Sequence, residues 1–524
     1  MKKYIQISLQ CLFFTILCHT TYAQVQIIPY PNDIITKTGE IDVSQGIHPT
    51  GKSNHLSYLK KMLETEFAIP TDKGIPIQLH IQANKNSNPE AYTLDIKKNK
   101  IAIEASTETG IFYGIQSLKQ LLLHAKQIPL LTIKDAPAFK WRSFMLDDAR
   151  YFQGKETVKR LLDDMALLKM NRFHWHLTND AGWRIEIKSF PLLTEIGSRR
   201  DSSQINDNGK KWNSTRTDHK EHRGFYTQED IKEIIAYATE RHIMIIPEVS
   251  MPGHMSAAIA SYPFLGTKKQ KISIPAYFGV VTEVLDVSSP QAKDFVRTVL
   301  KEVAELFPSN YIHIGGDEVK YDQWKASPAI QEYMKSNDID SYYDLQVYFT
   351  NEISKFVENS LHKRVIGWNE ILGRNVHEWA KENNAKTSLS KSAIIQFWKG
   401  NAEDLLFGIE KGHEVINSDH RYTYLDYTYK QIDLEKAYNF NPIPEGINDE
   451  QKKQIIGLGA QMWGEWTPTA KEVEYQTYPR IAAYAETGWT AVSHKDYKRF
   501  QNSINNLTKY WISKGYKFPT GSVL

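Results

Sequence analysis

Two adjacent carboxylates, Asp317 and Glu318, are the side chains of this sequence best placed for acid–base chemistry. They follow an apolar run, 311–314, and two glycines, Gly315 and Gly316. Because glycine allows a sharp backbone turn, consecutive side chains after it can reach one cavity. Paired carboxylates act as proton donors and acceptors in hydrolases. An isolated Asp-Glu dipeptide, by contrast, is more often a pair of solvated charges in a loop. The preceding run and glycines favour a catalytic site.

Two histidines, His174 and His176, form a second candidate site. Residues at i and i+2 of a strand project from the same face, so both rings could bind one metal ion. A metal centre needs further histidine or carboxylate ligands, and the other predicted strand ends offer mainly tryptophan, asparagine and acids. A metal-dependent barrel hydrolase is therefore the minor alternative.

Short apolar runs, separated by stretches of helical period, must position these residues. Eight runs are candidate strands: 142–145, 172–177, 242–246, 311–314, 364–366, 393–397, 414–417 and 458–462. Among the helical stretches, 228–241 starts with Thr227 as N-cap and Asp230 at the third helical position, which is a capping-box arrangement. Eight strand–helix units predict an α/β fold, a (β/α)8 TIM barrel, with its active site at the carboxyl ends of the strands.

The predicted catalytic barrel occupies 137–491. Residues 24–136 mix short alternating strands with helices and predict a small α+β domain. Residues 492–524 predict a C-terminal helix and tail. Within the barrel, the polar insertion 201–223 has no core of its own, so we expect a surface loop near the mouth of the site.

Residues 1–23 have the pattern of a signal peptide, in which Lys2 and Lys3 precede an apolar run and a small-residue cleavage site. The run is too short to span a bilayer. We therefore expect an exported protein, periplasmic or extracellular. Both cysteines, Cys11 and Cys18, lie in this segment, so the mature chain has no disulfide. A lipid anchor on Cys18 is less favoured, because Leu17 before it is bulky.

The charge of the chain is nearly balanced. Lys and Arg number 64 and Asp and Glu 61, and cleavage removes two of the lysines, which leaves a formal charge near +1. Long runs of one sign are lacking, so neither nucleic acid nor an anionic membrane is indicated as a partner. The chain has 12 tryptophans, whose faces stack well on the apolar faces of sugars, although most tryptophans are core residues.

Several motifs, in order and spacing, resemble family 20 glycoside hydrolases, the β-N-acetylhexosaminidases. They are 142–150, 173–180, 247–254, 313–318, 365–368, 424–426 and 462–465. The region 92–122 is similar to the N-terminal accessory domain of the family. The resemblance implies exo-acting removal of terminal N-acetylglucosamine or N-acetylgalactosamine from oligosaccharides or glycoconjugates, without metal or organic cofactor. It also implies retaining catalysis, in which the acetamido oxygen of the substrate attacks and forms an oxazolinium intermediate.

The same resemblance implies roles for individual residues. Glu318 would be the general acid and later the base, which requires a raised pKa, and Asp317 would orient the acetamido group. Tyr424 would contact the acetamido oxygen. The aromatic walls would be Trp368, Trp398 and Trp463. The residues that bind the outer hydroxyls would be Arg150, Asp426 and Glu465. For Arg150, a structural ion pair with Asp147 or Asp148 is the rival interpretation.

Two departures from the family pattern concern tuning and openness of the site. The histidine expected to contact the acid is His254, and where the family commonly has an aspartate to orient it, this chain has Asn179. Asparagine can position a histidine but supplies no charge. After Asp426, the segment 427–438 lacks the additional tryptophan of some members, so we expect that side of the pocket to be more open. A glycan-binding protein that has lost turnover is the other alternative function.

Overall fold

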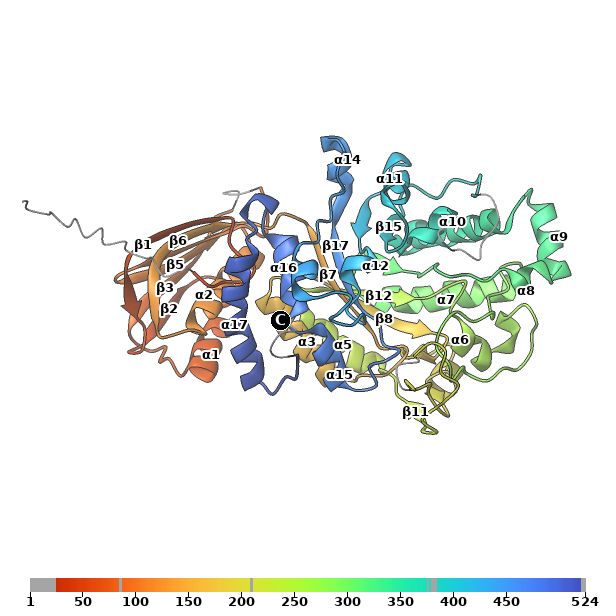
Figure 1. The fold of residues 1–524 in the computed structure, drawn as a ribbon, viewed down its shortest axis with the longest axis horizontal. Coiled ribbons are helices and arrows are strands. Elements are labelled where there is room, and N and C mark those ends of the chain that lie inside the picture. The colour runs from red at the N-terminus through yellow and green to blue at the C-terminus, as the bar shows by residue number, and fades with distance from the viewer. Residues whose placement is uncertain (1–24, 84–86, 208–210, 375–376, 378–383, 520–524) are drawn as a thin grey trace, which may run out of the picture.

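The computed structural model describes residues 25–83, 87–207, 211–374, 377 and 384–519, so the expected signal peptide lies outside the described residues. An N-terminal sheet with two helices precedes a larger barrel unit, and the C-terminal helix lies between them (Figure 1). The predicted fold, a (β/α)8 barrel preceded by a small α+β domain, is confirmed.

The N-terminal domain is a six-stranded mixed sheet in the order β1-β6-β4-β5-β3-β2. Its elements are β1 (Asp33–Asp42), β2 (Ile47–Gly51), α1 (Leu56–Phe67), β3 (Ile75–Ile81), β4 (Tyr92–Lys97), β5 (Lys100–Ala105), α2 (Glu108–Leu122) and β6 (Gln127–Asp135). Helix α2 lies almost directly on the sheet, because a Cβ at Gly110 would come within 2.3 Å of the Ala91 carbonyl oxygen. Such close packing requires glycine at that position.

Eight parallel strands close the barrel in chain order, because the last strand pairs with the first. They are β7 (Trp141–Asp147), β8 (Arg172–Asn179), β12 (Met244–Val249), β13 (Tyr311–His313), β14 (Arg364–Trp368), β15 (Ile394–Phe397), β16 (Val415–Asn417) and β17 (Ile455–Met462). Each predicted run coincides with one strand. The third run begins two residues early, since His242 is in a left-handed turn with φ of 55°.

Helices surround the barrel (Figure 1). The longer ones among the described residues are α3 (Lys155–Leu167), α5 (Gln228–Thr239), α7 (Pro290–Leu306), α9 (Pro328–Ser336), α10 (Tyr342–Leu361), α11 (Ala402–Glu410), α15 (Ala470–Thr477), α16 (Arg480–Trp489) and α17 (Tyr497–Ser513). The capping box of α5 is confirmed: Thr227 accepts from the Asp230 backbone N–H, and the Asp230 side chain accepts from that of Thr227.

Short elements fill the connections between strands and helices. They are β9 (Gly182–Trp183), α4 (Leu192–Glu195), β10 (Arg199–Arg200), β11 (His222–Arg223), α6 (Ser256–Ser261), η1 (Pro263–Leu265), α8 (Asp322–Lys325), η2 (Asn369–Leu372), α12 (His420–Thr423), α13 (Leu434–Tyr438), α14 (Asp449–Gln454) and η3 (Val492–His494). The insertion 201–223 is thus closed at its base by the β10–β11 pair.

The interior of the barrel is filled by side chains in layers. An apolar cluster packs together from the starts and middles of the strands: Trp141, Ile246, Ile366, Ile394, Ile416 and Ile456. A second, aromatic cluster comes from the carboxyl ends and the residues just after them: Met145, Trp368, Tyr424 and Trp463. The carboxyl-end layer is therefore the one that can present aromatic side chains to a ligand.

Buried polar contacts join the two domains. Lys169, after α3, lies 3.3 Å from Asp135 at the end of β6, and both side chains are fully buried. Trp489 of α16 donates to the same carboxylate at 2.9 Å. From the barrel, Arg142 forms a 2.7 Å ion pair with Glu90 of the N-terminal domain.

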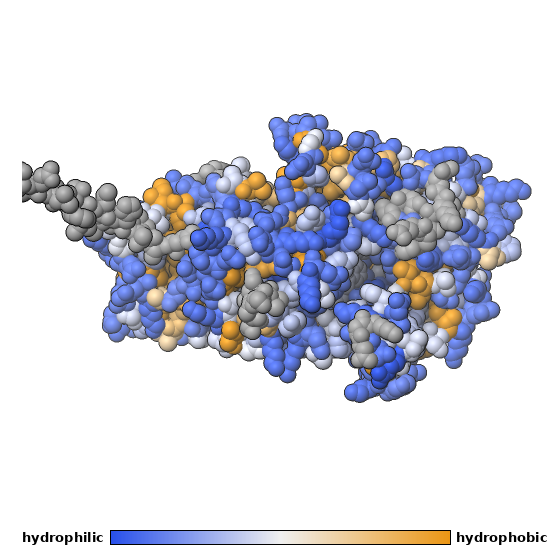
Figure 2. Space-filling view, viewed as in Figure 1, coloured by the Kyte–Doolittle hydropathy of each residue, from blue (hydrophilic) through white to orange (hydrophobic). Residues whose placement is uncertain are grey.

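The face of the molecule seen in Figure 2 is largely hydrophilic, with separate hydrophobic patches. Across the part of the chain that the structure describes, every helix is too short or too polar to cross a membrane.

Candidate active site

A cavity of about 290 Å³ opens at the carboxyl ends of the barrel strands. Twelve residues line it: Arg150, Trp212, Gly279, Val280, Asp317, Glu318, Trp398, Tyr424, Asp426, Tyr427, Trp463 and Glu465. Eight of these were expected site residues, and these eight follow five different strands, β7, β13, β15, β16 and β17. The barrel therefore brings together residues that are up to 315 positions apart.

The turn after β13 points both carboxylates into this cavity. Gly315 and Gly316 have φ of 67° and 87°, and Glu318 itself has φ of 53°. A Cβ at Gly316 would lie 2.3 Å from Ile371 Cγ2. The two glycines are thus required by both backbone conformation and space, and the left-handed Glu318 is a strained residue of the kind found at functional sites.

His254 lies between the carboxylates and a third acid. Its Nε2 is 3.6 Å from Glu318 Oε2 and 3.7 Å from Asp317 Oδ2. Its Nδ1 is 2.7 Å from Asp180 Oδ2. Asp180 also accepts the backbone N–H and the hydroxyl of Ser256, at 3.0 and 2.5 Å. A charged chain, Asp180–His254–Glu318, therefore holds the ring against the expected acid.

The partner expected for His254 was Asn179, and this expectation is wrong by one residue. The Asn179 amide instead lies 3.0 Å from His176 Nε2, and its oxygen accepts the Asp180 backbone N–H at 2.7 Å. Asn179 ends β8, and the chain turns there into β9, so the next side chain is the one that faces His254. The negative charge that the sequence seemed to lack is thus supplied by Asp180.

The two carboxylates have pKa values shifted in opposite directions. Burial is the largest cause that raises the pKa of Asp317 above its usual range; the charge of His254 opposes it, and those of Glu370 and Glu248 add to it. Burial also favours a raised pKa for Glu318, but the interaction with His254 outweighs it, and the pKa lies below the usual range. A raised pKa was expected for Glu318, but the carboxyl group whose pKa is raised is that of Asp317.

His254 gains a positive charge from the same contacts. Burial lowers its pKa, yet the charge of Asp317 and the bonds to Asp180 and Glu318 raise it well above the usual range. The site therefore holds an imidazolium beside two carboxylates that share one proton.

Charged residues line the cavity across from this pair. Arg150 lies 3.1 Å from Asp147 and 3.5 Å from Glu465, so it both forms the structural ion pair considered for it and lines the cavity. The buried Oδ1 atoms of Asp317 and Asp426 lack a hydrogen-bond partner among the described residues. A buried acceptor without a partner is costly, so these two atoms are suited to a polar ligand.

Aromatic rings form the walls. Trp398 and Tyr424 are nearly parallel, at 10° and 6.0 Å between ring centres, and Trp398 donates to Glu370 at 2.8 Å. Trp463 lies 5.1 Å from the Arg150 guanidinium. Trp368, also expected as a wall, is fully buried and packs 5.7 Å from Trp463, so it supports the wall from beneath.

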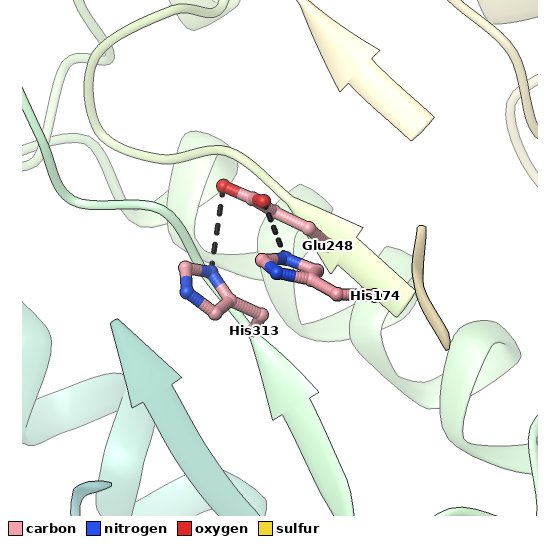
Figure 3. A group of neighbouring side chains, drawn as sticks. All are labelled: His174, Glu248 and His313. Carbon is pink, nitrogen blue, oxygen red and sulfur yellow. Dashed lines mark hydrogen bonds and ion pairs between the residues drawn. The ribbon is translucent and has the colours of Figure 1, made fainter. Parts of the chain in front are cut away.

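Below the aromatic layer, the buried carboxylate of Glu248 contacts both histidines that were considered as metal ligands, His174 and His176. Glu248 Oε2 is 2.7 Å from both His174 Nε2 and His176 Nδ1. His313 Nδ1 is 3.4 Å from Oε1 (Figure 3). The same Oε1 accepts the Trp368 indole N–H at 3.1 Å. Burial opposes ionisation of Glu248, but the three histidines hold its pKa well below the usual range.

The cluster can also be judged as a metal site. Ligand atoms of His174, Glu248 and His313 lie within 4.8 Å of one another. His313 Nδ1, however, accepts the Gly315 backbone N–H at 3.0 Å, and Glu248 is already bonded to His174 and Trp368. A metal ion would have to replace these bonds, whereas as they stand they join strands β8, β12, β13 and β14 beneath the site.

Four lining residues were not among the expected ones: Trp212, Gly279, Val280 and Tyr427. Trp212 belongs to the insertion 201–223, where a single tryptophan in a polar loop was the available signal. Tyr427 follows Asp426 directly and occupies part of the side that was expected to be open. Gly279 and Val280 lie in a long connection without a motif.

A closed (β/α)8 barrel with paired carboxylates in an aromatic-walled polar cavity defines a glycoside hydrolase. The family model "Glycosyl hydrolase family 20, catalytic domain" matches residues 139–492, and "domain 2" of that family matches 24–136. The chain belongs to glycoside hydrolase family 20.

Curated relatives and solved structures agree with this family. A β-hexosaminidase of Porphyromonas gingivalis is 32% identical over 95% of this chain, and the chain spans 66% of its length, just under two thirds. A β-hexosaminidase of Vibrio furnissii is 34% identical over 90% of this chain and 77% of its own. The structure of an exo-β-N-acetylglucosaminidase of Vibrio harveyi matches with a TM-score of 0.81 and 30% identity, over 95% of this chain and 79% of that one.

Proposed function

We propose that this protein is an exo-acting β-N-acetylhexosaminidase, which releases terminal N-acetylglucosamine or N-acetylgalactosamine from the non-reducing end of glycans. The observation that carries the proposal is the pair Asp317–Glu318, both facing the cavity and both within 3.7 Å of the His254 ring. The relatives named β-hexosaminidase support the substrate class.

The arrangement favours a nucleophile that belongs to the substrate. A retaining glycosidase with its own nucleophile holds two carboxyl groups on either side of the scissile bond, about 5–5.5 Å apart. Here the two carboxylates are consecutive residues beside one imidazole, and the other acids that line the cavity, Asp426 and Glu465, follow different strands, β16 and β17. The acetamido carbonyl oxygen at C2 of the sugar is then the group that attacks C1.

Glu318 carries the proton in both steps. It protonates the glycosidic oxygen as the C1–O bond breaks and the carbonyl oxygen bonds to C1, which gives an oxazolinium ion and the free alcohol. The resulting carboxylate then removes a proton from water, whose oxygen attacks C1 and reopens the ring. Two inversions at C1 give net retention.

Asp317 and Tyr424 orient the attacking group. The Asp317 Oδ1 atom can accept the acetamido N–H and stabilise positive charge as it develops on the ring. Binding of that N–H requires the carboxylate form, so substrate binding moves the shared proton to Glu318, where it is needed. His254, held by Asp180, positions Glu318 and balances the charge of the pair.

One end of the cavity limits the enzyme to a terminal sugar. Arg150, Asp426 and Glu465 offer charged donors and acceptors, which suit ring hydroxyls that both donate and accept. The cavity, at about 290 Å³, is at the small end of the range for ligand pockets, roughly 300–1,000 Å³. Both features support binding of one sugar rather than a chain.

Export is part of the same proposal. The pattern of 1–23 supports cleavage and release to the periplasm or the exterior, where glycans are available. The reaction as proposed uses only side chains of the chain, the substrate and water, so we infer that metal ions and organic cofactors are not required.

Hydrolysis of 4-nitrophenyl N-acetyl-β-glucosaminide tests the activity. Wild-type protein should release nitrophenol with and without a chelator, and Glu318→Gln should lose roughly 10²–10⁴-fold in kcat, the usual share of a general acid–base group. Asp317→Asn should also lose kcat, because an amide cannot supply the negative charge. Binding without turnover would favour a glycan-binding protein, and chelator-sensitive activity that survives Glu318→Gln would favour a metal site.

A further inference from the structure

We propose that Trp212, carried by the insertion 201–223, forms the wall of the sugar subsite at the end that binds the outer hydroxyls, and so covers the C4–C6 side of the terminal sugar. This rests on the proposed function, because it assigns a specificity-determining residue to the same pocket.

Trp212 is unusual in being a large, exposed apolar side chain on the cavity wall. It lines the cavity together with Asp426 and Glu465, yet 54% of its surface is exposed. The residues around it in the insertion are polar. An exposed indole on the wall of a cavity can contact a ligand directly, and its face fits the C–H face of a pyranose.

The contacts of Trp212 place it across the barrel mouth from Glu318. Its ring packs edge-on against Trp466, at 5.3 Å and 84°, and Trp466 directly follows Glu465 after β17. In the closed barrel, β17 is the eighth strand and β13, which carries Glu318, is the fourth, so the two lie on opposite sides. The tryptophan therefore faces the terminal hydroxyls rather than the leaving group.

The neighbouring lysine confirms this end of the cavity. Lys211 Nζ lies 5.6 Å from the Trp466 ring. Burial and the charge of Glu465 raise the pKa of Asp426, and the charge of Lys211 opposes that rise. The tip of the insertion is thus close enough to the Asp426–Glu465 pair to act on it.

A second loop holds the insertion in place. Gln204 of the insertion makes two hydrogen bonds to this loop, residues 276–280. Its backbone N–H donates to the Ala276 carbonyl oxygen at 2.7 Å, and its side-chain oxygen accepts from the Phe278 backbone N–H at 2.9 Å. Tyr277 donates to the Thr215 carbonyl at 2.9 Å. The next two residues of the loop, Gly279 and Val280, line the cavity. The wall is therefore built before a ligand arrives, which reduces the cost of ordering it on binding.

The predicted preference follows from this position. A ring over the C4–C6 side adds dispersion contact to a sugar whose outer hydroxyls are free, and it blocks a substituent on those hydroxyls. The favoured substrates are glycans ending in an unsubstituted N-acetylhexosamine, and the wall contributes to exo-action.

The test is the affinity for free N-acetylglucosamine, measured by calorimetry, because this sugar fills the terminal subsite alone. Trp212→Ala should weaken binding about five- to ten-fold, the size of one aromatic contact. The KM values for the aryl glycoside and for N,N′-diacetylchitobiose should rise by the same factor, with kcat within about two-fold. Trp212→Phe should restore most of the affinity.

Phe225→Ala is the matched control. Phe225 is a half-exposed aromatic residue in the connection between β8 and β12, which also carries Trp212, but its side chain does not line the cavity. Phe225→Ala should leave the affinity for N-acetylglucosamine and both KM values unchanged. A Trp212→Ala protein that keeps its affinity for the free sugar and loses only on the disaccharide would overturn the assignment in favour of the leaving-group side. Unchanged values throughout would overturn it as well. If wild-type protein neither hydrolyses the aryl glycoside nor binds the sugar, the proposed function fails instead.

Discussion

One histidine determines which of Asp317 and Glu318 holds the proton that they share. Two carboxylates buried together cannot both ionise cheaply, so burial and mutual repulsion raise one pKa. The imidazolium of His254 decides which, because its interaction with Glu318 holds the pKa of that residue below its usual range, whereas burial outweighs the same charge at Asp317. An acetamido N–H bonded to Asp317 would favour the carboxylate form of that residue and so shift the proton to Glu318.

Asp180→Asn should weaken this arrangement. Without the Asp180 charge His254 loses its proton more easily, the pair loses its neighbouring cation, and the pKa of its shared proton rises. We expect kcat to fall roughly 10- to 100-fold, the usual cost of removing the partner that orients a functional histidine, and the alkaline limb of kcat/KM to move to higher pH. A pH–rate profile measures both effects.

Asn179→Ala is the comparison for that profile, since Asn179 bonds to His176 and not to His254. Its alkaline limb should stay where it is in wild-type protein. If Asn179→Ala moved the limb and Asp180→Asn did not, the assignment of the His254 partner would be wrong.

At the scale of elements, strand register brings the buried charges together. Glu248 on β12 is in register with His176 on β8 and with His313 on β13, which places two histidines beside one carboxylate. The sequence predicted these strands because buried parallel strands read as short apolar runs. It could not predict which of two adjacent polar residues, Asn179 or Asp180, faces the site, because a shift of one residue at a strand end reverses the direction of the side chain.

Loops were harder to predict than strands. The carboxylate pair could be found because two glycines mark its turn. The aromatic and acidic residues after β16 and β17 were found through their motifs, and Trp398 through its place at the end of a predicted strand. Trp212 could not be placed, because its position depends on contacts such as Gln204 with Ala276, between loops distant in sequence. Periodicity carries no information on such contacts.

Glu248→Gln tests the buried cluster. The charge of Glu248 raises the pKa of Asp317, so its removal should lower the pKa of the shared proton. The alkaline limb of kcat/KM should move to lower pH, which is opposite to the shift expected for Asp180→Asn. Thermal unfolding of the same variant should show a lower Tm, because the histidines and Trp368 lose a charged acceptor. A limb that moves upwards would show that Glu248 does not act on the pair through its charge.

At the scale of the whole molecule, the N-terminal domain is fixed to the barrel by buried charge. Asp135 of β6 accepts from Lys169 and Trp489, so the two domains share one polar centre. Burial is the main cause that lowers the pKa of Lys169, to about 8, while Asp135 opposes that shift. The lysine thus depends on its partner to remain charged.

Asp135→Ala should destabilise the protein by about 3–5 kcal/mol, because it leaves a buried ammonium without its carboxylate. The double variant Asp135→Ala with Lys169→Met should recover a large part of that loss. Chemical denaturation of both proteins measures the difference. Equal stability of the single and double variants would contradict a buried charge as the source of the loss.

In the mechanism that we propose, the nucleophile is the acetamido oxygen of the substrate, oriented by Asp317. The most direct measurement is kcat/KM for 4-nitrophenyl β-glucosaminides whose N-acetyl group carries zero, one, two or three fluorine atoms. Each fluorine makes the carbonyl oxygen a poorer nucleophile, so we expect a steep, progressive fall in kcat/KM. A rate that is insensitive to fluorine, or a sugar covalently attached to the protein, would contradict it.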